Sequence, residues 1–167
     1  MTNLPPNTTA ESVHRLFAGV DVGADELMLV IRKNGKPFDP QKYANTRTDR
    51  TRLVNKLIKL PGIKVCLEAT GIYHFDLAIA LHDAGIPVMV INPKASHNFA
   101  KVLMRNSKTD AVDANTLAEY VERMDFVAWI RPSNQVLALR GFARRINALT
   151  GQKAAAKNHL HALSATQ

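Results

Sequence analysis

Cysteine is almost absent from the sequence: Cys66 is the only one among 167 residues. A single cysteine excludes an internal disulfide and a zinc site built from several cysteines, and it suits a reducing compartment. No segment approaches the ~20 apolar residues that span a bilayer. Residues 1–10 also lack the basic and apolar segments of a secretory signal. We therefore expect a cytoplasmic protein without a membrane segment.

Acidic residues are absent from residue 131 onward, although this tail carries six cations: Arg131, Arg140, Arg144, Arg145, Lys153 and Lys157. Such a pattern predicts a basic helix that leaves the preceding domain. Arg140, Arg144 and Arg145 are therefore candidate nucleic-acid contacts. The pattern fits equally well a helix that packs on a further domain or on a second subunit.

Composition indicates a globular protein that associates with polyanions. Hydrophobic residues make up 46% of the chain, charged residues make up 22%, and the formal net charge is +8. Nucleic acid is the obvious polyanionic partner for such a chain. We expect a flexible N-terminus over residues 1–14, a catalytic domain over 15–130, and a basic helical extension over 131–167.

The first third of the chain predicts strands. Residues 16–22 and 26–31 are short apolar runs that are typical of strands. Asn34–Gly35 follows them and favours a type I′ hairpin turn, so the next strand should run antiparallel. We place this third strand, residues 38–44, at the sheet edge because Pro40 has no N–H to donate.

Helices and strands alternate in the rest of the domain. A helix starting at Thr48–Asp49 should end before Pro61–Gly62, and further helices are expected over residues 71–85 and 107–124. Residues 63–67 and 87–91 predict parallel strands joined by a helical crossover. The predicted fold class is therefore α/β, a ribonuclease-H-like mixed sheet with flanking helices and a C-terminal basic helical extension.

Four acidic residues stand at conspicuous places in this scheme. Asp21 lies inside the first apolar run, where burial of a carboxylate is costly unless it is paired or binds a metal. Glu68 ends a central strand, at the edge where open α/β sheets keep their sites. Asp110 and Asp113 are three residues apart and share a helix face. Each has an ordinary alternative: a hairpin carboxylate, a solvated strand-end acid, or a pair that complements the helix dipole.

The predicted fold brings the first strand, the end of the central strand and the last helix to one edge of the sheet. Four carboxylates there would repel one another unless divalent cations neutralised them, and oxygen-only ligands favour Mg²⁺ or Mn²⁺ over zinc. Two ions ~3.5–4 Å apart can hold the attacking and leaving oxygens of a phosphodiester. The implied chemistry is in-line phosphoryl transfer.

Four segments together resemble the N-terminal domain of the IS110-type transposases and the related pilin-gene invertases. They are residues 19–22 (Gly-Val-Asp-Val), 67–71 (Leu-Glu-Ala-Thr-Gly), 91–93 (Ile-Asn-Pro) and 107–114 (Ser-Lys-Thr-Asp-Ala-Val-Asp-Ala). That group has a RuvC-like, ribonuclease-H-like fold and an Asp-Glu-Asp-Asp tetrad. The resemblance implies that Asp21, Glu68, Asp110 and Asp113 bind metal and catalyse DNA strand cleavage and rejoining.

The resemblance also implies partners: DNA, a structured guide RNA in some relatives, and further copies of the full-length protein. Two departures from the family pattern matter. Gly23–Ala24 stand where relatives often have a lysine, and the chain ends at Gln167 without the serine-bearing transposase domain that follows in relatives. We therefore expect a fragment or truncated product that can be inactive alone.

Four cations flank the second half of the acidic group and are candidate DNA-backbone contacts: Lys94, Lys101, Arg105 and Lys108. Surface lysines and arginines are as often merely solvated. Three other functions stay open: a catalytically silent nucleic-acid-binding module, a RuvC-like Holliday-junction resolvase, and an actin-like ATPase. The ATPase requires two related lobes, which this length does not hold.

Overall fold

The computed structural model describes residues 15–104 and 109–165. The chain divides into two compact units, one up to Trp129 and one from Ile130 onward. The expected flexible N-terminus, residues 1–14, lies outside the described residues.

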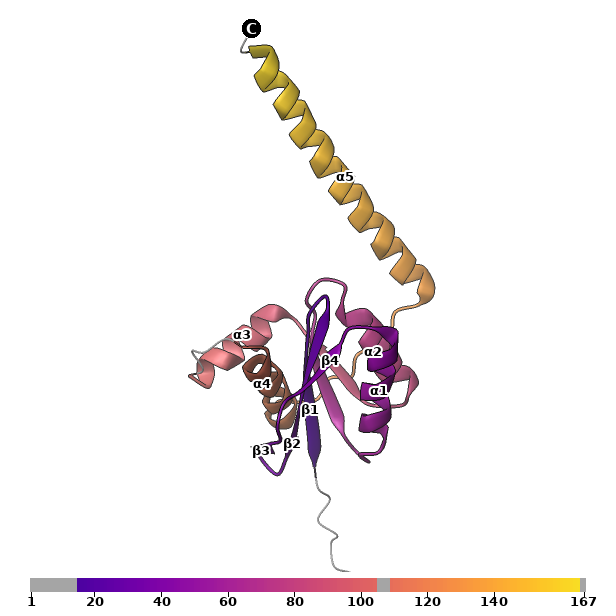
Figure 1. The fold of residues 1–167 in the computed structure, drawn as a ribbon, viewed down its shortest axis with the longest axis vertical. Helices are drawn as coiled ribbons and strands as arrows, with labels where there is room; N and C mark the ends of the chain where they lie inside the picture. Colours follow the sequence, from indigo (N-terminus) through magenta and orange to yellow (C-terminus); the bar gives the residue numbers. More distant parts are fainter. Residues whose placement is uncertain (1–14, 105–108, 166–167) are drawn as a thin grey trace, which may run out of the picture. The chain divides into compact units, whose positions relative to one another are not determined.

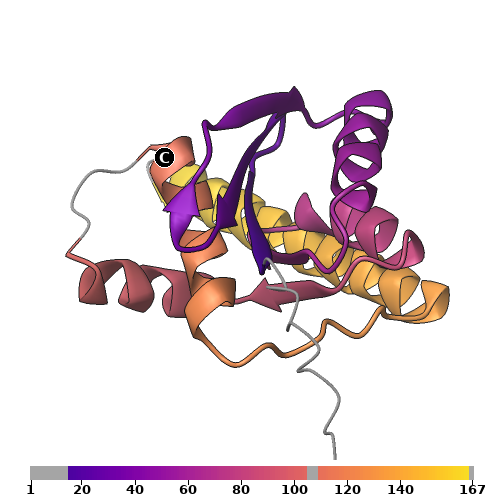
Figure 2. The same cartoon turned by 90° about the horizontal axis from the view of Figure 1, so that it is seen from below.

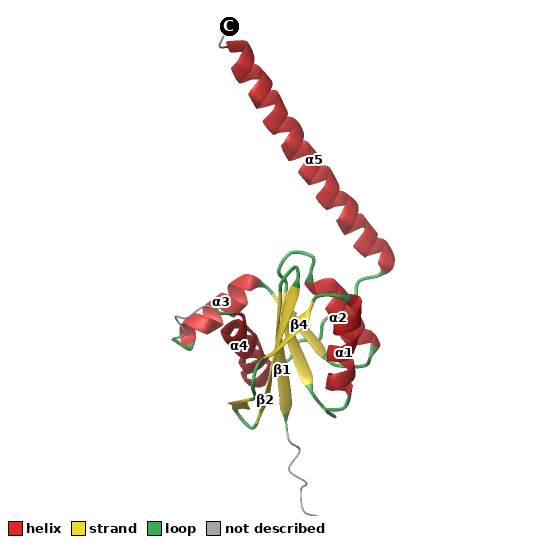
Figure 3. Cartoon of the chain, in the orientation of Figure 1, coloured by secondary structure: helices red, strands yellow, loops and turns green. Residues whose placement is uncertain are grey.

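A six-stranded mixed sheet forms the centre of the first unit (Figure 3). The order is β3-β2-β1-β5-β6, and β4 also pairs with β2. β1 pairs antiparallel with β2 and parallel with β5, and β5 pairs parallel with β6. The strands are β1 (Leu16–Val22), β2 (Glu26–Lys33), β3 (Lys36–Pro37), β4 (Gln41–Ala44), β5 (Lys64–Glu68) and β6 (Val88–Ile91).

The turn after β2 has the expected chemistry, because Asn34 and Gly35 adopt φ angles of 52° and 79°. The third strand is wrong in extent: instead of one strand over residues 38–44, the chain forms β3 and, after a break, β4. Pro40 falls in that break, where the missing N–H costs no ladder hydrogen bond. Both short strands pair with β2.

Helices cover both sides of the sheet (Figure 1, Figure 2). α1 (Arg47–Ile58) and α2 (His74–Asp83) lie on one side, where Leu53, Leu57 and Leu77 join the larger core. Their starts differ from the prediction. Thr46 caps α1 by accepting a hydrogen bond from the Asp49 amide, and α2 begins at His74, three residues later than expected.

α3 (Pro93–Val102) and α4 (Asp110–Arg123) lie on the other side, over a smaller core that includes Cys66 and Leu117. The sequence interpretation missed α3, although Asn92–Pro93 is a good helix start. The Asn92 side chain accepts from the Ala95 amide, and Pro93 occupies the first turn. Thr109 caps α4 in the same way, because its side chain accepts from the Val112 amide.

The confirmed fold class is a mixed sheet with flanking helices in the predicted ribonuclease-H-like order. The predicted C-terminal helix is present as α5 (Asn134–Ala165), which buries none of its residues. Apolar side chains of α5, including Leu139, Phe142 and Ile146, are consequently exposed. Across the described ranges, no helix combines the length and apolar character needed to cross a bilayer.

Candidate functional site

Asp21 and Glu68 lie at the carboxyl ends of two neighbouring parallel strands. β1 and β5 pair in register up to Val20 opposite Leu67, so Asp21 and Glu68 are the next position along. Side chains alternate between the faces of a strand, and Asp21 therefore shares a face with Gly19 and Phe17. Phe17 packs against α4 in the smaller core. Both acids thus belong to the α4 side of the sheet.

α4 can approach this face closely because residue 19 is glycine. A Cβ atom at Gly19 would lie 2.1 Å from the Ala114 carbonyl oxygen and 2.3 Å from the Ala118 nitrogen, so no side chain fits there. The helix backbone rests almost directly on β1. Asp110 and Asp113, in the first turn of α4, are brought beside the end of β1 as a result.

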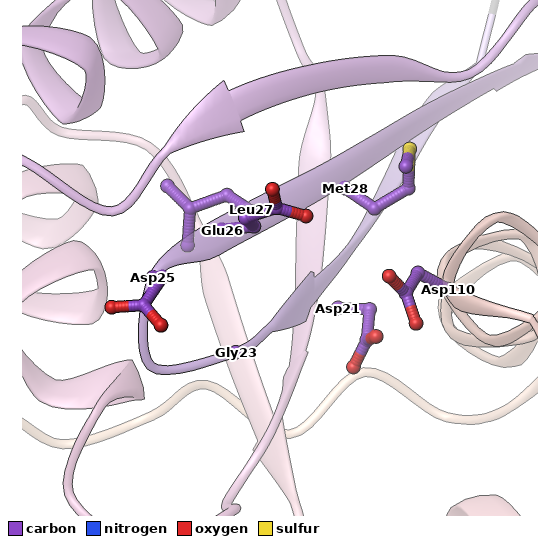
Figure 4. Close-up of a pocket in the computed structure, with 7 residues that line it drawn as sticks. All are labelled: Asp21, Gly23, Asp25, Glu26, Leu27, Met28 and Asp110. Atoms are coloured by element: carbon purple, nitrogen blue, oxygen red, sulfur yellow. The ribbon is translucent and has the colours of Figure 1, made fainter.

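All four acids that were predicted from the sequence line one groove. Its lining includes Asp21, Glu68, Asp110 and Asp113, together with residues of α3. Asp21 and Asp110 also border an adjoining pocket over the start of β2, where Figure 4 shows their side chains next to each other. Asp25, from the same pocket, lies on its opposite side.

The electrostatics of Asp21 reflect this crowding. Partial burial and then the negative charges of Asp113, Asp110 and Glu68 raise the pKa of the Asp21 carboxyl from 3.8 to about 6. A like charge nearby disfavours ionisation, and the effect requires the carboxylates to be close. The residues therefore form one electrostatic unit, although they come from three elements far apart in the sequence.

Glu68 is held by two hydroxyl groups. Thr70 Oγ1 donates to Glu68 Oε1 at 2.6 Å, and Ser96 Oγ donates to Glu68 Oε2. Ser96 is the only buried residue of α3. Through this serine, α3 orients the glutamate.

The donor set suits a hard divalent cation, because the acids and hydroxyls of the groove offer oxygen ligands, and among the described residues that line it there is a single histidine, His97, and no cysteine. Besides partial burial, repulsion by the other three acids raises the pKa of Asp21, and a bound cation would relieve that repulsion. Within residues 15–104 and 109–165, however, no three Asp, Glu, His or Cys side chains already form a ligand set for one ion. The residues fit in chemical type, and their side chains would have to converge on a cation.

Of the predicted DNA-contacting cations beside the acids, Lys94 lines the groove. Lys101 is exposed further along α3, and Arg105 and Lys108 lie outside the described residues. Arg140, Arg144 and Arg145 are all exposed on α5.

Among the residues of the groove that sequence reasoning missed are Thr70, Ser96 and His97. Thr70 stands two residues after Glu68, within the quoted Leu-Glu-Ala-Thr-Gly segment, and could have been found there. Ser96 and His97 depend on α3, which was not predicted, so the sequence offered no periodicity to place them.

Comparison with known proteins gives one family and several distant structural similarities. A family model described as a DEDD transposase of the IS110 type matches residues 18–164. Among curated proteins, none matches this chain.

Two solved structures of DNA-junction enzymes are similar at low identity. RuvC of Thermus thermophilus in complex with a Holliday junction substrate is 14% identical, with a TM-score of 0.47, over 69% of this chain and 99% of that one. The fowlpox virus Holliday junction resolvase is 17% identical, with a TM-score of 0.44, over 64% and 97% of the two chains. The identification depends on the family match, which covers most of the sequence. This chain belongs to the IS110-type family of DEDD transposases.

Proposed function

We propose that this chain carries a metal-dependent DNA-cleaving site in which Asp21, Glu68, Asp110 and Asp113 are the catalytic, metal-binding residues. One observation carries the proposal: acidic side chains from β1, β5 and α4 line a single groove, where partial burial and the charges of the other three acids raise the pKa of Asp21. Family membership supplies the substrate class, because a transposase acts on DNA.

Each side chain has a distinct task in this proposal. Thr70 and Ser96 hold Glu68 in one orientation, so its carboxylate is ready to ligate without a search of rotamers. Asp21 and the α4 pair supply the remaining oxygen donors. Bound Mg²⁺ or Mn²⁺ would provide Lewis-acid activation of the nucleophile and stabilisation of the departing 3′ oxygen.

The DNA backbone would follow the cations around the groove. Lys94 lines its α3 wall, and Lys101 lies further along the same helix. Cations that neutralise phosphates supply sequence-independent affinity and position the strand. We assign Arg105, Lys108 and the α5 residues Arg140, Arg144 and Arg145 to the same role.

The remaining parts of the proposal concern partners. Exposed apolar residues of α5 recur at intervals of three and four: Leu139, Phe142, Ile146 and Leu149. This is the spacing of a helix that packs against another helix. We propose a second copy of the full-length protein as its partner, a structured guide RNA as a further one, and the cytoplasm as the location.

A cleavage assay tests the catalytic assignment. The chain is incubated with Mn²⁺ and supercoiled plasmid or a four-way DNA junction, beside the variants Asp21→Asn and Asp113→Asn. Each variant should lower the cleavage rate by at least about a hundredfold, because a ligand of the reacting metal is lost. Asp25→Asn is the matched control, since it removes an acid from the adjoining pocket only.

The outcomes separate the alternative functions. Cleavage confined to the four-way junction would favour a resolvase. Cleavage that is absent in all proteins, with DNA binding equal in wild type and both variants, would favour the catalytically silent binding module. The proposed activity also includes strand rejoining at the same four acids, but the assay scores cleavage alone.

A further inference from the structure

Arg32 is a charged residue of β2 that is buried against α4, with 4% of its surface exposed. Its guanidinium donates from Nε to Glu122 Oε2 (2.6 Å), from Nη1 to Asn115 Oδ1 (2.9 Å) and from Nη2 to the Gly35 carbonyl oxygen (2.7 Å). Nη1 also lies 3.5 Å from Glu119 Oε2. The planar group is thus engaged on every side.

Three of these partners form one stripe along α4. Asn115, Glu119 and Glu122 are spaced by four and three residues, which places them on one face of the helix. Glu122 also accepts from the Gly35 amide at 2.9 Å. Arg32 and the turn that follows β2 therefore form hydrogen bonds with the same side of α4.

This network determines where α4 lies on the sheet more than it stabilises the fold. Desolvation of a buried arginine and its carboxylates offsets most of their attraction, so a buried ion pair is weak evidence of a stabilising contact. A guanidinium, however, has its donors fixed in one plane and fits its acceptors in only one arrangement. An apolar contact at this place would let α4 slide along the sheet, whereas the Arg32 network does not.

The position of α4 determines where its acids lie. Arg32 pairs with Phe17 across the β1–β2 ladder, and Asp21 lies four residues further along β1 on the same face, about 13 Å away. At the other end of α4, Asp110 and Asp113 occupy the first turn. Because a helix of this length moves as one body, a shift at Glu119 and Glu122 displaces both aspartates relative to Asp21.

We propose that Arg32 is a positioning residue of the acidic groove. Together with Glu119 and Glu122, it fixes α4 along the sheet so that Asp110 and Asp113 face Asp21 and Glu68. The catalytic meaning of this role rests on the proposed function, whereas the role in helix placement does not.

Two readouts on the 167-residue chain test the inference. The first needs no metal: nuclear Overhauser contacts between the Gly19 α-protons and the Ala118 amide report the docking of α4 on β1. The second is calorimetric Mn²⁺ affinity. The variants are Arg32→Met, which keeps the stem but removes the donors, and Arg32→Lys, which keeps the charge but not the planar fork. Glu122→Gln is a milder third variant in case both Arg32 variants unfold.

Leu57→Ala is the matched control, because it destabilises the chain from the opposite side of the sheet. The inference predicts that the folded Arg32 variants lose or weaken the Gly19–Ala118 contacts and bind Mn²⁺ at least about tenfold more weakly. Leu57→Ala should lower the melting temperature without changing either readout.

The result that overturns the inference is a folded Arg32→Met or Glu122→Gln chain with wild-type contacts and wild-type Mn²⁺ affinity. If wild type itself binds no Mn²⁺, the proposed metal site fails instead. The Overhauser contacts still decide the role of Arg32 in that case, so the two failures are distinguishable.

Discussion

Gly19 on β1 lies so close to Ala114 on α4 that a Cβ atom would come within 2.1 Å of the Ala114 carbonyl oxygen. Backbone contacts of this kind cannot relax by a change of rotamer, so any side chain at position 19 must push α4 off the sheet. The contact lies midway between the Arg32 network and the acidic groove. Gly19 and Arg32 together account for the placement of α4.

Gly19→Ala should therefore destabilise the chain strongly. Overpacking typically costs 1–3 kcal/mol, and a clash with backbone should cost about 3 kcal/mol or more. Chemical denaturation monitored by circular dichroism measures the change. Gly141→Ala is the control: a Cβ there meets no atom within 4 Å, and alanine favours the helix by about 1 kcal/mol. Equal stabilities for Gly19→Ala and wild type would contradict the close packing.

Asp21 should make the metal-free chain less stable as the pH rises from 4 to 6. Its pKa is about 6 in the folded chain and near 3.8 when unfolded, so the folded state binds the proton more tightly in this window. A tenfold difference in proton affinity between the two states corresponds to about 1.36 kcal/mol, and partial exposure of the carboxyl reduces the total cost of ionisation to about 1–2 kcal/mol.

Asp21→Asn removes this cost, so the variant should match wild type near pH 4 and melt a few degrees higher at pH 7.5, both in EDTA. Thermal melts across this pH range provide the measurement. A variant that is less stable than wild type at pH 7.5 would show that the carboxylates do not repel one another there.

The hydroxyl groups on Glu68 should matter for metal affinity more than for stability. Removing a group that orients a ligand usually weakens metal binding by 10–100-fold, so Ser96→Ala and Thr70→Val should each weaken Mn²⁺ binding about tenfold. Thr51→Ala serves as the control, because its hydroxyl bonds only within α1. Unchanged affinity in both groove variants would mean that Glu68 is oriented without these hydroxyls.

The basic residues of α5 should contribute salt-dependent DNA affinity. Each lost phosphate contact lowers the slope of log K against log salt by about 0.9, so Arg144→Gln with Arg145→Gln should lower it by up to about 1.8. Fluorescence anisotropy with duplex DNA at several salt concentrations measures the slope. Arg47→Gln with Lys59→Gln removes the same charge around α1 and should leave the slope unchanged. Identical slopes for both pairs would show that charge, and not position, governs binding.

Much of the fold followed from local patterns. Asn34–Gly35 predicted its turn correctly because positive φ angles favour these residues, and the elements that were predicted follow one another in the right order. The predicted starts of the helices were less accurate. Several polar residues near the start of α1 could cap it, and the sequence alone does not show that Thr46 makes the capping hydrogen bond. α3 was missed because it buries only Ser96 fully, and its few apolar side chains, such as Ala95 and Phe99, gave too weak a periodic signal in the sequence.

The acidic residues of the site were predictable from the sequence, but the residues that hold them in place were not. Asp21, Glu68, Asp110 and Asp113 stand out because carboxylates interrupt apolar runs or begin a helix. Whether they bind metal stays a prediction. Arg32 ends an apolar strand and looks like an ordinary solvated cation in the sequence. Its burial depends on α4, more than 80 residues away, and only the tertiary structure brings its partners to it.

Calorimetric titration of Mn²⁺ into the metal-free chain decides whether the four acids form a metal site, with Asp113→Asn beside wild type and Asp25→Asn as the control. We expect saturable binding to wild type and Asp25→Asn, and at least about tenfold weaker binding to Asp113→Asn. Binding that is unchanged by Asp113→Asn, or absent from wild type, would contradict a metal site made of these four acids.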